Sequence, residues 1–175
     1  MVTSSPTRHA VLSAVALTAA LVLAACSGGD SVKVAAPAAT GSTAKQCAAL
    51  RAALPAVLQG HKPRGTTPKS PNTAAWGSPA IVLRCGVGTP GVLDPHSAAY
   101  DPAYARHNVA EINGLCWSSE QTADGGFVFT TVKQQAYVEV TVPPAYQHEQ
   151  SPVTTLAGPV LRTDPADPAH AFDCL

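Results

Sequence analysis

A cysteine near the N-terminus is the residue whose surroundings point most clearly to chemistry. Cys26 closes the run Leu23-Ala24-Ala25-Cys26, at the end of an apolar segment that follows a single positive charge at Arg8. Bacterial lipoprotein signals end in this way, because the signal peptidase needs small residues before the cut and the next thiol accepts a diacylglyceryl group. The sequence predicts a signal peptide over residues 1–25 and a palmitate-type lipid anchor on Cys26. Such an anchor would hold the chain at the extracytoplasmic face of the cell membrane.

A second motif has the residue types of a nucleophile and its helper. Ser42-Thr43-Ala44-Lys45 matches the SxxK pattern of penicillin-binding proteins, in which the lysine assists a serine nucleophile. The companion motifs SDN and KTG are absent from the chain. We therefore interpret Ser42 or Thr43 as the N-cap of the helix that follows, and we predict no catalytic residue.

A loop between two expected strands contains side chains that bind divalent metals or transfer protons. These are Asp94, His96, Tyr100, Asp101, Tyr104 and His107. Their spacing matches no metal motif, and the repeated Asp-Pro and Ala-Tyr units are typical of a solvated insertion. We predict neither a metal nor a cofactor, and we expect that the protein is not an enzyme.

Four cysteines remain after the proposed anchor, namely Cys47, Cys85, Cys116 and Cys174. An even number in an exported chain favours two disulfides, and the sequence alone allows three connectivities. Cys47 shares a helix face with Leu50, Leu54 and Val57, and Cys85 shares a strand face with Ile81, Leu83 and Val87. These two faces are expected to pack together. This packing predicts a Cys47–Cys85 bridge and leaves Cys116 to pair with Cys174.

The charge of the chain excludes several partners. Removal of residues 1–25 leaves 150 residues with a formal charge of −1. A nucleic-acid-binding protein usually has a basic stripe that neutralises phosphates, and none is evident, so we predict no nucleic-acid partner. The length suits one domain, which we expect to be a monomer.

The chain after the signal peptide divides into a tether, a globular domain and a C-terminal tail. Residues 26–44 are rich in Ser, Ala, Gly, Thr and Pro and predict a lipidated, flexible tether. A globular domain is expected over residues 45–162, and residues 163–175 are expected to form a tail pinned by a disulfide. The expected helices span about 44–54 and 151–161, the second kinked or shortened at Gly158-Pro159. The expected strands span about 80–87, 111–118, 127–132 and 136–142. We therefore predict an α+β fold, in which a four-stranded antiparallel sheet carries two helices on one face.

The opposite face of that sheet is a candidate binding surface. Alternation along the strands directs Arg84, Tyr137 and Glu139 away from the helices, and Trp76 or Trp117 is expected at the edge of this face. The alternative is an ordinary exposed ion pair flanked by structural aromatic residues.

Several of these motifs together resemble a family. The order Cys47-Ala-Ala-Leu50, Trp76-Gly77-Ser78-Pro79, Ile81 to Val87, Asn113-Gly114 with Trp117, and Tyr137 to Pro143 resembles the actinobacterial lipoprotein family of unknown function DUF3515. The resemblance implies an exported, lipid-anchored envelope protein and supports the Cys47–Cys85 bridge. It transfers no catalytic residue.

Three classes of function follow from these observations. The first is a non-enzymatic envelope lipoprotein that binds an envelope protein or a cell-wall component. The second is a small-ligand carrier or sensor, which needs a pocket of a few hundred Å³. The third, a hydrolase or metalloenzyme, needs clustered catalytic groups that the motifs do not indicate.

Overall fold

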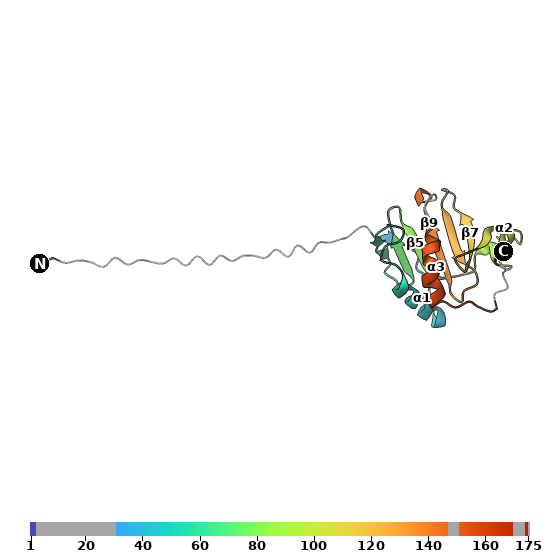
Figure 1. Cartoon of the computed structure of the whole chain (residues 1–175), viewed down its shortest axis with the longest axis horizontal. Coiled ribbons are helices and arrows are strands. Elements are labelled where there is room, and N and C mark those ends of the chain that lie inside the picture. Colours follow the sequence, from blue (N-terminus) through green and yellow to red (C-terminus); the bar gives the residue numbers. More distant parts are fainter. Residues whose placement is uncertain (3–30, 147–150, 170–173, 175) are drawn as a thin grey trace.

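The protein is an α+β domain built on one large sheet. The computed structural model describes residues 1–2, 31–146, 151–169 and 174. Seven strands form an antiparallel sheet in the order β2-β4-β5-β9-β8-β7-β6. Two helices, α1 (Gly41–Ala53) and α3 (Pro152–Thr163), lie side by side on one face of this sheet (Figure 1).

The other elements are short. The strands of the large sheet are β2 (Pro63–Arg64), β4 (Thr73–Trp76), β5 (Ile81–Val87), β6 (Val109–Ile112), β7 (Leu115–Gln121), β8 (Phe127–Thr131) and β9 (Tyr137–Val142). A separate parallel pair joins β1 (Val32–Lys33) to β3 (Thr66–Thr67). The remaining helical segments are η1 (Gly91–Leu93), α2 (Tyr104–Asn108) and η2 (Pro144–Tyr146).

The main core lies between the sheet and the two long helices. Alternate residues of β5 and β9 point into it, because successive side chains of a strand face opposite sides. Leu156 and Val160 of α3 meet this layer from above and are fully buried. Val153 and Ala157 of the same helix are also buried, whereas Leu161, which follows the same apolar pattern in the sequence, is 46% exposed.

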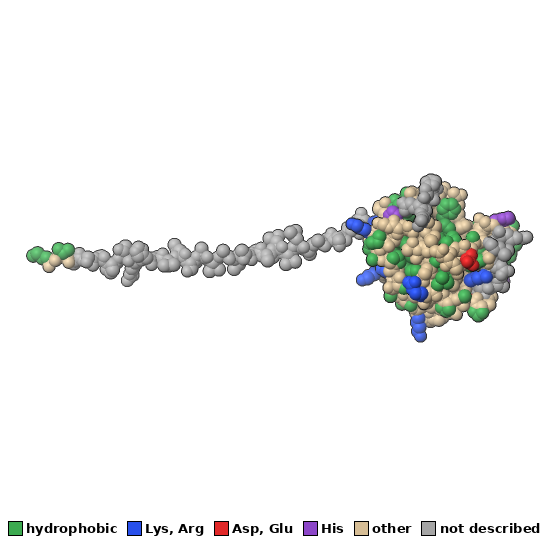
Figure 2. Space-filling model, in the orientation of Figure 1, with side chains coloured by type: hydrophobic (Ala, Val, Ile, Leu, Met, Phe, Trp, Pro, Cys, Tyr) green, Lys and Arg blue, Asp and Glu red, His purple; other side chains and the backbone are tan. Residues whose placement is uncertain are grey.

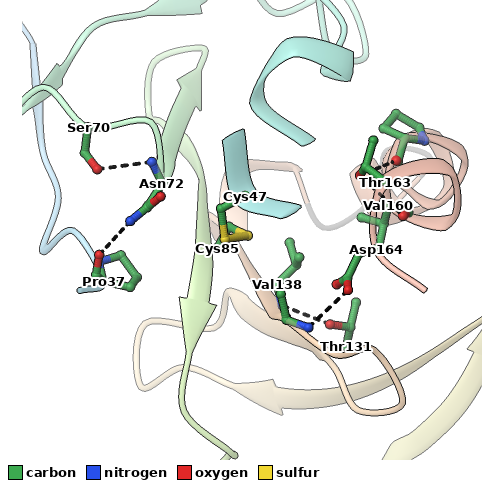
Figure 3. The surroundings of a disulfide bond; sticks show 12 residues. Pro37, Cys47, Ser70, Asn72, Cys85, Thr131, Val138, Val160, Thr163 and Asp164 are labelled. Atoms are coloured by element: carbon green, nitrogen blue, oxygen red, sulfur yellow. Dashed lines mark hydrogen bonds between the residues drawn. A yellow bond between two sulfur atoms is a disulfide. The ribbon is translucent and has the colours of Figure 1, made fainter. Parts of the chain in front are cut away.

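Both predicted disulfides are present. Cys47 of α1 is bonded to Cys85 of β5, with 5.5 Å between their Cα atoms, and the pair joins helix and sheet inside the core (Figure 3). Cys116 of β7 is bonded to Cys174, with 5.6 Å between their Cα atoms. The second bond links the C-terminal tail to a small apolar cluster on the opposite face of the sheet.

The sheet has seven strands, so the prediction of four was wrong. The strand expected over 111–118 is in fact a hairpin, in which β6 turns into β7 at Asn113 and Gly114. Both turn residues have positive φ, 51° and 80°, as a tight two-residue hairpin requires. The strands β2 and β4 lie before residue 80, where no strand was predicted, and they extend the sheet beyond β5.

The predicted tether also needs correction over its described part. Residues 31–40 lie against the domain instead of leading away from it. Val34 is buried, the Ala35 carbonyl accepts a hydrogen bond from Arg84 Nε at 2.9 Å, and the Pro37 carbonyl accepts one from Asn72 Nδ2 at 2.8 Å (Figure 3 shows the second). This covering segment is rich in alanine, with one proline and the two valines Val32 and Val34, and its sequence has no helical or strand periodicity.

Two helix predictions also change. Helix α1 begins at Gly41 with Thr40 as its N-cap residue, so Ser42 and Thr43 lie inside the first turn and neither caps the helix. Helix α3 continues through Pro159 to Thr163 and is not shortened there. In the described part of the chain, no helix has both the length and the apolar character needed to cross a membrane.

Candidate functional site

Charge is divided sharply along the chain, although the total is neutral. Residues 31–93 contain no Asp or Glu and seven basic side chains, whereas residues 94–175 contain ten acidic and three basic side chains. The boundary falls between β5 and β9 in the sheet, so one end of the domain is basic. Most of the Lys and Arg side chains visible in Figure 2 lie on the left half of the domain. The seven basic residues are Lys33, Lys45, Arg51, Lys62, Arg64, Lys69 and Arg84.

A hollow of about 560 Å³ opens at this basic end. Strand β2 pairs only with Ala75 and Trp76 of β4, and beyond that point the chain leaves the sheet and returns at Thr73. The segment 64–74 forms the wall of the hollow, and Arg51 from the last turn of α1 closes it. The hollow is therefore a product of the early departure of β2 from the sheet edge.

Three cations and three hydroxyl groups line this hollow, which we call the basic hollow. None of the described residues that line it is a carboxylate. Arg64 is held in place, since its Nη1 donates to the Gly77 carbonyl at 3.2 Å. Arg51 and Lys69 have exposed side chains and make no hydrogen bond or ion pair with any described residue. The polar lining residues are Arg51, Arg64, Thr66, Lys69, Ser70 and Thr73.

The hydroxyl groups at the base are already ordered by contacts with one another. Thr66 Oγ1 and Thr73 Oγ1 are 2.8 Å apart and share a hydrogen bond. Ser70 Oγ accepts the Asn72 backbone N–H at 3.1 Å. The loop is thus fixed by its own polar groups, which leaves Arg51 and Lys69 as the charges available to a ligand.

Two residues of the predicted binding surface, Arg84 and Glu139, lie on the face where they were expected. Arg84 of β5 and Glu139 of β9 are cross-strand partners on the face opposite the two long helices, and they form an ion pair at 2.9 Å. The register continues this row with hydroxyl residues, Thr73 on one side and Thr130 on the other. The Arg84 side chain is 32% exposed and that of Glu139 is 20% exposed, so the pair is half-buried.

The two aromatic residues assigned to that surface are not available on it. Trp76 is buried in the main core, where its Nε1 donates to the Pro55 carbonyl at 3.2 Å, so its expected position at the edge of the face was wrong. Tyr137 does share the face of Glu139 but is only 8% exposed, beneath the segment that follows β5. Burial raises the pKa of its hydroxyl.

The acidic end of the same face carries groups with altered proton affinity. Burial raises the pKa of Glu120, and the neighbouring Glu139 carboxylate raises it further. Burial, with a smaller effect of Glu120, raises the pKa of Tyr104 to about 12. Tyr104 donates its hydroxyl proton to the Ser119 carbonyl. These shifts follow from packing of the 94–107 loop on β7 and indicate a structural role for Tyr104.

The 94–107 loop lies against the sheet and is ordered by hydrogen bonds of its own aspartate side chains. The carboxylates of Asp94 and Asp101 accept the backbone N–H groups of residues two positions later, as in Asx turns. The His96, Tyr100 and His107 side chains are exposed. Within the described ranges, no group of three His, Cys, Asp or Glu side chains lies in an arrangement that could hold a metal ion.

A second, smaller hollow of about 340 Å³ lies beside the Cys116–Cys174 bond and contains a buried carboxylate. Asp164 is 2% exposed and accepts the Ala136 backbone N–H at 3.1 Å through Oδ1, whereas Oδ2 has no hydrogen-bond partner among the described residues (Figure 3). The Gln134 Oε1 atom in the same hollow is also without one. Burial raises the pKa of Asp164 from its ordinary 3.8 to about 6, and hydrogen bonds from the Ala136 and Gln135 backbone oppose this rise.

This carboxylate predicts a specific dependence of stability on pH. A raised pKa in the folded state means that Asp164 destabilises the fold when ionised, so its penalty is absent below about pH 4 and complete above about pH 6. The free energy of unfolding of the Asp164→Asn variant, taken relative to wild type, should therefore rise by about 3 kcal/mol when the pH is raised from 4 to 7. This figure corresponds to about 1.4 kcal/mol per unit of pKa. Urea unfolding at the two pH values measures this difference.

The control for that prediction is an exposed carboxylate with the opposite shift. A hydrogen bond from Thr122 lowers the pKa of Asp124. Asp124→Asn should thus lose stability relative to wild type as the pH rises from 3 to 5. A difference between Asp164→Asn and wild type that stays constant with pH would contradict the assignment of Asp164.

The basic hollow was not among the sites predicted from the sequence, although the sequence contains a signal for it. Arg51, Arg64 and Lys69 belong to a stretch of 63 residues without an acidic side chain.

The proposed anchor Cys26 and the signal segment lie outside the described residues, apart from Met1 and Val2. Ser42 and Lys45 of the SxxK motif are exposed on the first turns of α1.

Comparison with known proteins gives one match. Residues 9–169 match DUF3515, a family described as protein of unknown function. No curated protein and no solved structure matches the chain.

Proposed function

The chain belongs to the DUF3515 family of proteins of unknown function, and from this premise we propose that it is a lipid-anchored, extracytoplasmic binding protein of the cell envelope without enzymatic activity. The anchor is Cys26, which holds the chain in the bilayer after removal of residues 1–25. The two disulfides suit an oxidising compartment outside the cytoplasm. The protein acts as a monomer whose partner is an envelope protein or a cell-wall component.

One observation carries the binding role, namely the basic end of the domain. Arg51, Lys62 and Lys69 are exposed and have no ion pair with a described residue. A cationic surface of this kind attracts an anionic partner, and the attraction weakens as salt screens it. The acidic residues lie mainly at the other end of the sheet, so the domain would bind such a partner in one orientation.

A second function is favoured by the basic hollow itself. Its volume of about 560 Å³ lies within the range of small-molecule sites, about 300–1,000 Å³. A carrier or sensor of a small anionic ligand would use this hollow, whereas a partner protein would cover the wider basic surface.

The anchor is tested by replacing its cysteine. Cys26→Ala should abolish incorporation of labelled fatty acid and leave a precursor that retains residues 1–25, because no thiol is present to accept the diacylglyceryl group. Ser27→Ala, a neighbouring change that keeps the thiol, is the control and should be labelled like wild type. Normal labelling of the Cys26→Ala chain would contradict the anchor.

A further inference from the structure

The basic hollow has an excess of positive charge that the described residues do not neutralise. Two of its three cations, Arg51 and Lys69, have no partner among these residues, and none of the described lining residues is a carboxylate. Cations that line one concave site attract an anion, because each of them interacts favourably with its charge. The sequence around this hollow has no acidic residue over residues 31–93.

The chemistry of the lining selects among anions. Guanidinium groups bind phosphate and carboxylate oxygens through paired N–H donors, and a lysine adds a compact charge. A single carboxylate carries one negative charge, whereas a phosphate monoester carries close to two, which better matches three cations. The Thr66 and Ser70 hydroxyl groups offer further hydrogen bonds at the base of the hollow.

The size of the hollow indicates that the phosphate belongs to a larger molecule. A volume of about 560 Å³ far exceeds that of an inorganic phosphate ion, and Pro71 and Ala74 supply apolar wall. We propose that the basic hollow binds an organic phosphate of about sugar size, with the phosphate between Arg51, Arg64 and Lys69. This proposal rests on the binding role proposed above and assigns the chemical class of the ligand.

The test is calorimetric titration of the full-length protein in detergent with glucose 1-phosphate. Lys69→Gln and Arg51→Gln each remove one unpaired cation from the hollow and should each weaken binding about tenfold, the effect of losing one charge-assisted hydrogen bond. Both side chains are exposed and make no internal contact through their charges, so the variants should fold. Arg64 is left unchanged because its contact with the Gly77 carbonyl supports the strand edge.

A matched variant separates the site from the general basic surface. Lys45→Gln removes an exposed cation from the same helix as Arg51, at a position that does not line the hollow. It should change the affinity less than about twofold at physiological salt, where charges more than about 8 Å apart are screened. Equal losses in Lys45→Gln and Lys69→Gln would overturn the site.

Other ligands test the assigned chemistry. Glucuronate has a similar body with a carboxylate, and inorganic phosphate lacks the body, so both should bind at least about tenfold more weakly than glucose 1-phosphate. Equal binding of glucuronate would overturn the phosphate assignment, and equal binding of inorganic phosphate would overturn the organic body. Absence of saturable binding up to about 10 mM, which corresponds to less than 3 kcal/mol, would overturn the whole inference. Fatty-acid labelling of Cys26 is independent of these results, so failure of the hollow and failure of the anchor are distinguishable.

Discussion

Removing the Cys47–Cys85 disulfide by the paired substitutions Cys47→Ala and Cys85→Ala should lower the free energy of unfolding by about 4 kcal/mol. The bond spans 38 residues, and closing a loop of this length in the unfolded chain accounts for a change of that size. Since small domains are stable by only about 5–15 kcal/mol, the variant should unfold at a much lower urea concentration.

The second disulfide is the matched control for this prediction. The Cys116–Cys174 bond closes a loop of similar length, 58 residues, so chain entropy alone gives a similar loss of about 4 kcal/mol. Cys174 is only half-buried, whereas Cys47 and Cys85 are 0% and 2% exposed and pack between α1 and β5. The first pair should therefore cost more than the second. An unchanged urea midpoint after removal of the first pair would contradict its role as the link between helix and sheet.

Replacing Gly86 by alanine should destabilise the fold by about 2–5 kcal/mol. Gly86 has φ of 82° at the irregular position of β5 between Cys85 and Val87, a backbone conformation that residues with a Cβ atom rarely adopt. A Cβ atom here would lie 2.8 Å from Ala39 Cβ and 3.2 Å from Thr43 Cγ2. It would therefore also push α1 and the segment before it away from β5. The expected cost combines a backbone penalty of about 1–2 kcal/mol with overpacking of about 1–3 kcal/mol.

Two other glycines separate these contributions. Gly41 also has a positive φ, 57°, but a Cβ atom there would meet nothing within 4 Å, so Gly41→Ala should show the backbone penalty alone. Gly88 has neither feature, and Gly88→Ala should leave stability unchanged or slightly raised. Urea unfolding of the three variants measures the series. A Gly86→Ala protein as stable as Gly88→Ala would show that residues 31–40 do not pack as described.

Sequence reasoning succeeded where one face of an element had to be apolar. Cys47 and Cys85 could be paired because each lies on the buried face of a regular element, and two buried faces must pack together. The same logic located β5, β8 and β9 to within about one residue. It also separated the Arg84 and Glu139 face from the core.

The misses have identifiable causes. Strands β2 and β4 are short and lie in a region rich in proline, so local signals there favour loop, and only pairing with β5 makes them strands. Asn113-Gly114 is a strong hairpin signal that a single strand over 111–118 overlooked. Residues 31–40 have no periodicity, and their position follows from contacts with Asn72 and Arg84 that are distant in sequence.

The net charge of the whole chain is zero, so the overall composition does not indicate the basic hollow. Its cations come from α1, β2 and the turn before β4, and only the early end of the β2–β4 pairing brings them together. The sequence itself, however, shows that basic residues predominate in residues 31–93 and acidic residues in 94–175. A comparison of these two parts predicts an anionic partner for the first.

The most direct test of the lipoprotein proposal is the intact mass of the wild-type protein isolated from a membrane fraction without reduction. We expect the mass of residues 26–175 plus a diacylglyceryl group on the thiol of the first residue, Cys26. The other four cysteines should resist alkylation until a reductant opens both disulfides. An unprocessed chain with an unmodified Cys26, or four cysteines that react without reduction, would contradict the proposal that this is an exported, lipid-anchored domain.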